Sequence, residues 1–150
     1  MKNGLLLIIF LMFFYNAKSQ EFTVKRIQIK NPNTNSWDDL MTFSKLNINV
    51  LENKNIVFYD YNLRMIEMLA GKEYVGGYDN VSFTNTGLES QDANQGIYGY
   101  TGFINLSGKN NFSIKKEAYV SLMYYPSSNK LGMIEIRNKL CMCYIRFWLN

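Results

Sequence analysis

Residues 43–60 read FSKLNINVLENKNIVFYD, and this stretch decides the fold class. Its first half alternates, so that Leu46, Ile48 and Val50 fall on one face of an extended chain and polar residues fall on the other. The polar run 52–55 has the composition of a turn, and apolar residues resume at Ile56. The pattern predicts a β-hairpin with one buried face and one solvated face.

Similar patterns recur along the chain. We expect further strands over residues 22–30, 63–69, 81–84, 97–106, 118–125, 133–137 and 140–148. Residues 63–70 also suit one short helix ending at Gly71. Eight or nine short strands joined by tight turns predict an all-β, mainly antiparallel meander, which forms either a small barrel or a sandwich.

Three local features refine this expectation. The apolar positions of residues 22–30 change face in mid-strand, which indicates a β-bulge. Residues 36–39 suit either one capped helical turn or a plain turn, and residues 85–96 lack periodicity, as a long loop would. Gly99 and Gly102 suggest a sharp bend or a close approach of another backbone, as at a barrel corner.

The first nineteen residues have the pattern of an export signal. Lys2 precedes an unbroken apolar run over residues 5–14, and the small residues Ala17 and Ser19 follow it. The run is shorter than the roughly 20 residues that span a bilayer as a helix. We expect residues 1–19 to be a signal peptide cleaved between Ser19 and Gln20, and residues 20–150 to form a single secreted or periplasmic β domain with no transmembrane helix.

The absence of histidine from the sequence limits the possible chemistry. It excludes a Ser-His-Asp or Cys-His relay, and two cysteines alone cannot complete a structural zinc site. Phosphate-binding and dinucleotide-binding glycine motifs are also missing from the sequence. We therefore predict no metal and no cofactor, and we favour a non-catalytic role.

The charge pattern gives no nucleic-acid signature. Lys2 and Lys18 account for two of the 16 basic residues, so the chain after Ser19 has 14 basic and 12 acidic residues, a net charge of +2. Its only adjacent basic pairs are Lys25-Arg26 and Lys115-Lys116. Nucleic-acid binding needs a denser cationic face, so we do not expect it.

Cys141 and Cys143 lie two positions apart and share one face of a predicted strand. Their Cα atoms would be about 6.5–7 Å apart, at the limit for a disulfide. Two buried thiols, a strained and reducible disulfide, and a bond to another chain all remain open.

The aromatic residues are the main candidates for binding. Tyrosines 59, 61, 98, 100, 119, 124 and 125 could line a pocket or a glycan platform, although cross-strand packing accounts for them equally well. The candidate residues for ligand or partner binding are Tyr98, Tyr100, Tyr124, Tyr125 and Trp148. Our leading hypothesis is an exported non-catalytic domain that binds another protein through its loops and aromatic faces.

Three alternatives remain. A barrel of this size could hold a small apolar or glycan ligand, which makes it lipocalin-like in architecture only. Loop carboxylates at Asp38, Asp39 and Asp79 could serve a small hydrolase. A minimal outer-membrane barrel is disfavoured, because Lys45, Asn47 and Asn49 would face lipid.

Overall fold

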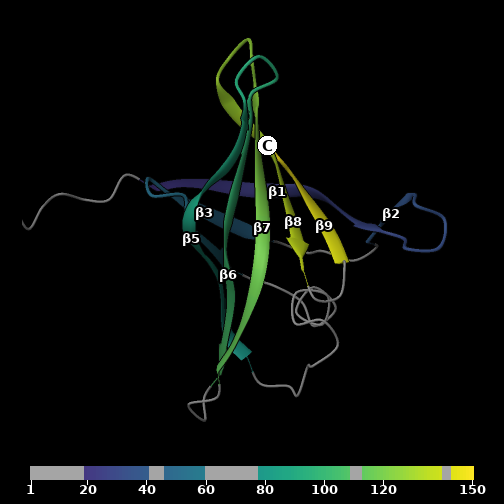
Figure 1. Cartoon of the computed structure of the whole chain (residues 1–150), viewed down its shortest axis with the longest axis vertical. Coiled ribbons are helices and arrows are strands. Elements are labelled where there is room, and N and C mark those ends of the chain that lie inside the picture. The colour runs from purple at the N-terminus through teal and green to yellow at the C-terminus, as the bar shows by residue number, and fades with distance from the viewer. Residues whose placement is uncertain (1–18, 41–45, 60–77, 109–112, 140–142) are drawn as a thin grey trace, which may run out of the picture.

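The computed structural model describes residues 19–40, 46–59, 78–108, 113–139 and 143–150 (Figure 1). These residues form nine antiparallel strands. The strands are β1 (Ser19–Lys30), β2 (Trp37–Asp39), β3 (Asn47–Leu51), β4 (Ile56–Tyr59), β5 (Tyr78–Asp92), β6 (Ile97–Gly108), β7 (Ser113–Tyr125), β8 (Lys130–Asn138) and β9 (Cys143–Leu149).

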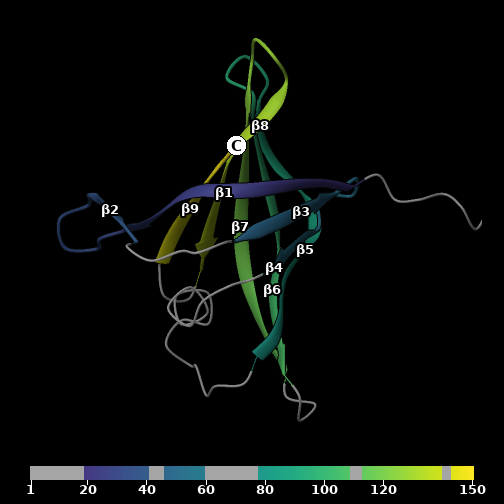
Figure 2. The same cartoon turned by 180° about the vertical axis from the view of Figure 1, so that it is seen from behind.

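The strands close into a barrel. From β3 to β9, each strand pairs with the next one in sequence, and β1 pairs with both β3 and β9. Eight strands thus form a closed ring, and β2 extends the sheet from the edge of β1. Figure 2 shows β1 crossing the long strands β6 and β7. The predicted all-β antiparallel class is confirmed, and the barrel, not the sandwich, is the form it takes.

Strand β1 closes the ring because it pairs with both β3 and β9. Residues 19–23 pair with β3, and the pairing with β9 runs from Val24 to Ile29. The register with β9 shifts between Val24 and Arg26, which confirms the predicted bulge. Because the bulge changes which face each side chain takes, both Phe22 and Ile27 are buried.

A continuous apolar core fills the ring. The alternation predicted for residues 43–51 is confirmed where it is described, since Leu46, Ile48 and Val50 are buried. The rings of Phe58 on β4 and Phe147 on β9 meet across the barrel, with centroids 5.5 Å apart. Side chains from strands that are not neighbours therefore contact each other inside the barrel.

The prediction of a loop over residues 85–96 is wrong. Strand β5 continues to Asp92, and only residues 93–96 form a turn. Register shifts between Asn85 and Gly87 and between Leu88 and Ser90 interrupt the alternation of β5. Each extra residue moves the following side chains to the other face, so a strand with two bulges has no single period.

The predicted turn over residues 36–39 is also corrected, because Trp37–Asp39 is strand β2. Its three residues pair with residues 28–30 of β1, a partner that local sequence does not reveal. The predicted strand or helix over residues 63–70 lies outside the described residues. So do residues 41–45 and 140–142, which belong to the predicted strands 43–51 and 140–148.

The glycines of β6 permit close approach, as the sequence suggests. A Cβ atom on Gly102 would collide with the carbonyl oxygen of Thr84 and the ring of Phe83. A Cβ on Gly99 would collide with the Tyr119 hydroxyl, which lies within hydrogen-bond distance of Ser90 Oγ at 2.6 Å. Both positions therefore need glycine for space.

Candidate functional site

Two turns lie together at one end of the molecule. We call the hairpin end residues 88–100, around the β5–β6 turn, and residues 124–131, around the β7–β8 turn. It lies at the top of Figure 1, beyond the level of β1. The amide of Tyr124 donates a hydrogen bond to the carbonyl oxygen of Gly96 at 2.8 Å, which joins the two hairpins. Gly96 has a φ of 67°, a conformation that favours glycine.

Three of the predicted binding residues meet at the hairpin end. Tyr98 and Tyr100 lie opposite Leu122 and Val120, which places them on the face of the sheet that lines the barrel. The rings of Tyr98 and Tyr124 pack edge to face, with centroids 5.7 Å apart. Tyr98, Tyr100 and Tyr124, which we call the tyrosine cluster, are thus brought together by the register of β6 with β7.

The cluster is partly withdrawn from water. Burial raises the pKa of Tyr100, and the nearby phenol of Tyr98 raises it further. Burial also raises the pKa of Tyr124, with smaller contributions from Tyr100 and Tyr98. The raised pKa values keep the hydroxyl groups of Tyr100 and Tyr124 neutral at physiological pH, so each can both donate and accept a hydrogen bond.

The same end exposes large apolar side chains. Leu88 is 53% exposed and Tyr125 is 46% exposed. The Tyr125 ring lies over Gly132, where a Cβ atom would collide with it. Among the described residues, the only other exposed large hydrophobic side chain is Tyr59, at 44%, on β4. Two of the three exposed large hydrophobic side chains in the described part of the chain thus lie at the hairpin end.

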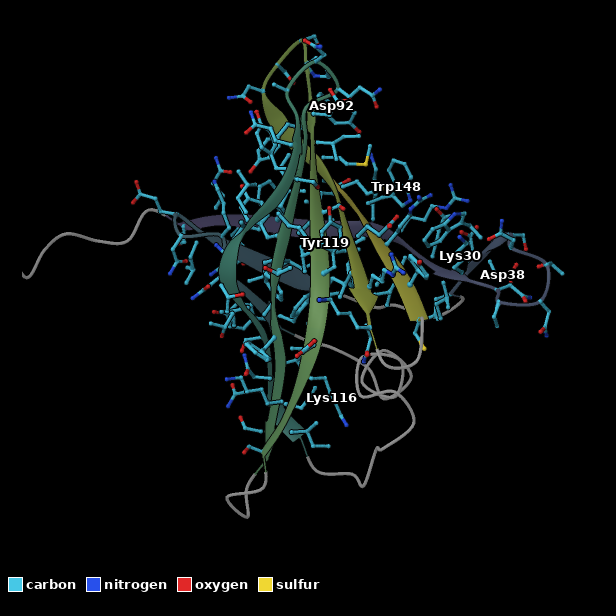
Figure 3. All side chains as sticks on the ribbon, viewed as in Figure 1. Lys30, Asp38, Asp92, Lys116, Tyr119 and Trp148 are labelled. Carbon is cyan, nitrogen blue, oxygen red and sulfur yellow. The ribbon has the colours of Figure 1, made fainter. Side chains whose placement is uncertain are left out.

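Trp148 does not join the tyrosine cluster. Trp148, labelled in Figure 3, lies on β9 with its side chain on the outer wall. Register places it opposite Met133 of β8, which is only 4% exposed. Its indole Nε1 donates to Gln28 Oε1 at 2.8 Å across to β1. The hydrogen bond therefore ties Trp148 to β1 on the outer wall, on the other face of the sheet from the tyrosine cluster.

Sequence reasoning missed a group of cations and aromatic rings on the outer wall. Register places Arg137 opposite Tyr144, and Lys30 opposite Trp37. Lys30 Nζ lies 4.8 Å from the centroid of the Tyr144 ring, and the Arg137 guanidinium lies 5.1 Å from it. Lys30 of β1 is far in sequence from Tyr144 of β9, so no local motif predicts that they meet.

A second set of contacts on the same wall fixes β2. The Arg146 guanidinium lies 3.6 Å from the centroid of the Trp37 ring, and Arg146 Nε donates to Glu135 Oε2 at 2.6 Å. Arg26 donates to both carboxylate oxygens of Asp39, at 2.8 and 3.1 Å. These contacts hold the extra strand against the barrel.

The carboxylates of β2 do not form a facing pair. The hydrogen bond from Arg26 lowers the pKa of Asp39, so this carboxylate remains ionised. Asp38 accepts hydrogen bonds from Asn31 and Ser36, and alternation along the strand directs it away from Asp39. The described residues hold no cluster of three metal-binding side chains. The Asp79 side chain lies outside this description.

The structure records Cys143 as disulfide-bonded. The sequence contains one other cysteine, Cys141, which lies outside the described residues. The role of this pair remains a prediction.

Fold and site together define a small closed antiparallel β-barrel, with one added strand and an aromatic end built from two hairpins. No protein-family profile matches the chain, and a search of curated proteins finds no significant relative. Within the residues described, no helix has the length and apolar character needed to cross a bilayer.

Proposed function

We propose that the protein is an exported, non-catalytic domain that binds another protein through the hairpin end. The observation that carries this proposal is the location of Leu88 and Tyr125, whose exposed side chains flank the same paired turns as the tyrosine cluster. Aromatic side chains are enriched in protein interfaces because they combine a large apolar area with hydrogen-bonding groups. The tyrosine cluster supplies both the apolar ring area and the hydrogen-bonding hydroxyl groups.

The hairpin end is suited to recognition because its backbone is held in place. The Tyr124–Gly96 hydrogen bond joins the turns, and Asp92 Oδ1 accepts from the Gln95 amide at 3.2 Å. A surface that is ordered before binding loses less conformational entropy on association. Its flanking charges, Glu89, Asp92 and Lys130, are exposed and would form the polar rim of such an interface.

Two of the alternatives, the ligand-binding barrel and the hydrolase, receive less support from the structure. A ligand-binding barrel needs interior space, but the Phe58–Phe147 contact and the surrounding core occupy the centre. A carboxylate hydrolase needs two facing acids, whereas Asp38 and Asp39 each have other partners.

Site-specific photo-crosslinking tests the protein-binding proposal. A benzoylphenylalanine at Tyr125 should form a discrete crosslinked product with one exported protein of the source cells. The same group at Tyr59 is a matched control, because that tyrosine is equally exposed but lies on β4. Equal crosslinking at both positions would contradict the proposal.

Competition shows whether the captured protein recognises this surface. Unlabelled wild-type protein and Tyr59→Ser should both suppress the Tyr125 crosslink. A Leu88→Ser, Tyr125→Ser double variant should fail to do so, because it removes the exposed apolar groups. If the double variant competes as well as wild type, binding does not depend on the hairpin end.

The proposed export has its own test. Ser19 and Gln20 are the first described residues of β1 and pair with Leu51 and Val50. Cleavage after Ser19 would shorten this strand by one residue and leave Phe22 in the core. Mass spectrometry of the exported protein should find Gln20, cyclised or not, at its N-terminus. A product that keeps residues 5–14 would refute cleavage.

A further inference from the structure

Strand β5 has an open edge where it rises into the hairpin end. Strand β4 pairs with it only at residues 81–83, and the amide of Asn85 then donates to Asn55 Oδ1 at 2.8 Å, where the β3–β4 turn meets β5. Residues 88–92, which we call the free edge, pair with β6 and with no other described strand. Figure 2 shows β3 and β4 below β1 and the hairpin end above it. One side of the free edge is therefore open to pairing with another extended chain.

The two faces of the free edge differ in chemistry. Leu88 lies opposite Tyr100, so it shares the face of the tyrosine cluster. The register shift after Leu88 puts Ser90 on the other face, where its Oγ lies 2.6 Å from the Tyr119 hydroxyl on the outer wall. Asp92 follows two positions later on that same outer face. A strand added here would thus meet an apolar side chain on one face and a carboxylate on the other.

Charge selects among the strands that could pair with the free edge. Its five residues include Glu89 and Asp92, both exposed, and no basic residue. Two copies of the protein pairing through this edge would bring like charges together, which is unfavourable. The bulge between Leu88 and Ser90 also works against indiscriminate pairing. The edge is therefore best matched by a different chain that carries basic side chains.

We propose that the protein partner contributes an extended segment that adds to the free edge as a new strand. This inference rests on the proposed function, because it specifies how the hairpin end holds that partner. Backbone hydrogen bonds supply affinity in strand addition, and side chains at alternate positions supply specificity. The segment alternates, with apolar side chains on the face of Leu88 and basic side chains on the face of Asp92.

A short capped peptide in which lysine and valine alternate is a defined probe. Its binding to the exported protein should slow amide hydrogen exchange within residues 88–92. Two N-methylated forms, one methylated at every lysine amide and the other at every valine amide, separate backbone pairing from side-chain attraction. Only one set of amides can face β5, so one form should bind as the parent peptide does and the other about tenfold more weakly. Equal affinities of the two forms would overturn the proposal.

Charge variants test the match of the peptide to the acidic edge. Glu89→Gln and Asp92→Asn should each weaken peptide binding about two- to fivefold at low salt. The asparagine keeps an oxygen that can accept from the Gln95 amide. Glu117→Gln is the matched control, because Glu117 is an exposed carboxylate on β7 outside the hairpin end. Equal effects of Asp92→Asn and Glu117→Gln, or equal binding of a peptide with glutamate in place of lysine, would contradict a basic segment.

Two further outcomes separate this inference from its rivals. Protection of residues 88–92 that grows with protein concentration, without peptide, would assign the free edge to a second copy and refute the proposal. In the complex crosslinked through position 125, the partner should protect the same residues. A crosslink that forms without this protection would refute strand addition and leave protein binding at the hairpin end in place.

Discussion

The phenol groups of the tyrosine cluster link the hairpin end to the stability of the fold. Tyr100 and Tyr124 have raised pKa values because burial disfavours the charged phenolate and other phenols lie nearby. The folded state therefore favours the protonated form more than the unfolded chain does. This contribution is complete below about pH 10, the ordinary tyrosine value, and is lost as pH rises through the raised pKa.

We predict that Tyr124→Phe weakens this alkaline dependence. The variant keeps the ring and removes the titrating hydroxyl, so its free energy of unfolding should fall less steeply than that of wild type above pH 10. Urea unfolding between pH 8 and 11 measures the difference, with Tyr59→Phe as the control on an exposed tyrosine. Parallel profiles for wild type and Tyr124→Phe would contradict the role of burial.

Gly102 and Gly87 differ in the room that their surroundings leave for a Cβ atom. A Cβ on Gly102 would collide with Thr84 and Phe83, whereas a Cβ on Gly87 would meet nothing within 4 Å. Gly102→Ala should therefore destabilise the protein by about 1–3 kcal/mol, and Gly87→Ala should change stability by less than about 1 kcal/mol. Thermal unfolding of both variants tests this, and equal costs would show that the close approach is unimportant.

Among the strands, β2 should have a lower local stability than the eight-strand barrel to which it is added. The strand pairs only with β1 among the described residues, and side-chain contacts to Trp37 and Asp39 secure it. Removing one of these contacts should free β2 without opening the barrel.

Trp37→Ala should accelerate amide hydrogen exchange at Asn31 and Leu40. These amides donate to Ser36 at 2.8 Å and to Ile27 at 3.0 Å, so they report on the attachment of β2. Loss of the Arg146 contact, about 1–2 kcal/mol, should speed their exchange roughly 5- to 30-fold. Strands β6 and β7 should keep their protection. Unchanged exchange at Asn31 and Leu40 would mean that the backbone pairing alone holds β2.

Sequence patterns predicted the elements whose alternation is regular and missed those whose pairing is set elsewhere. Strand β3 and the bulge in β1 were visible because their apolar residues mark the buried face. The sequence did not reveal the strand over residues 85–92, because two register shifts interrupt its alternation of buried and exposed residues. Trp37–Asp39 became a strand through its partner β1, which lies outside any local window.

The candidate site could also be predicted only in part from the sequence. Sequence composition singled out tyrosines as binding candidates, and three of them do meet at the hairpin end. Trp148, the fifth candidate, lies on the outer face of the barrel, and aromatic type alone does not show which face a residue occupies. Lys139 lies beside Glu117 because β7 pairs with β8, a contact that charge runs in the sequence cannot reveal.

At the scale of the whole molecule, the shared core should dominate stability. Phe58 is 2% exposed and contacts Phe147 across the barrel, whereas its neighbour Tyr59 is 44% exposed. Phe58→Ala should cost about 3–5 kcal/mol through lost burial and an unfilled cavity. Tyr59→Ala should cost less than about 1 kcal/mol. Chemical denaturation of this adjacent pair measures the contrast, and similar costs would argue against a packed interior.

The pairing of β1 with β9 sets the order in which assembly can finish. During synthesis the residues of β1 emerge early, but they cannot pair with β9 until the last residues of the barrel have followed. Until β9 pairs, β1 and β8 each expose an edge of unpaired backbone N–H and C=O groups. Such an edge can pair with strands of other chains and so promotes aggregation. Closure joins residues more than a hundred positions apart, so it is a slow step. A chain truncated before β9 would therefore keep these unpaired strand edges and remain prone to aggregation.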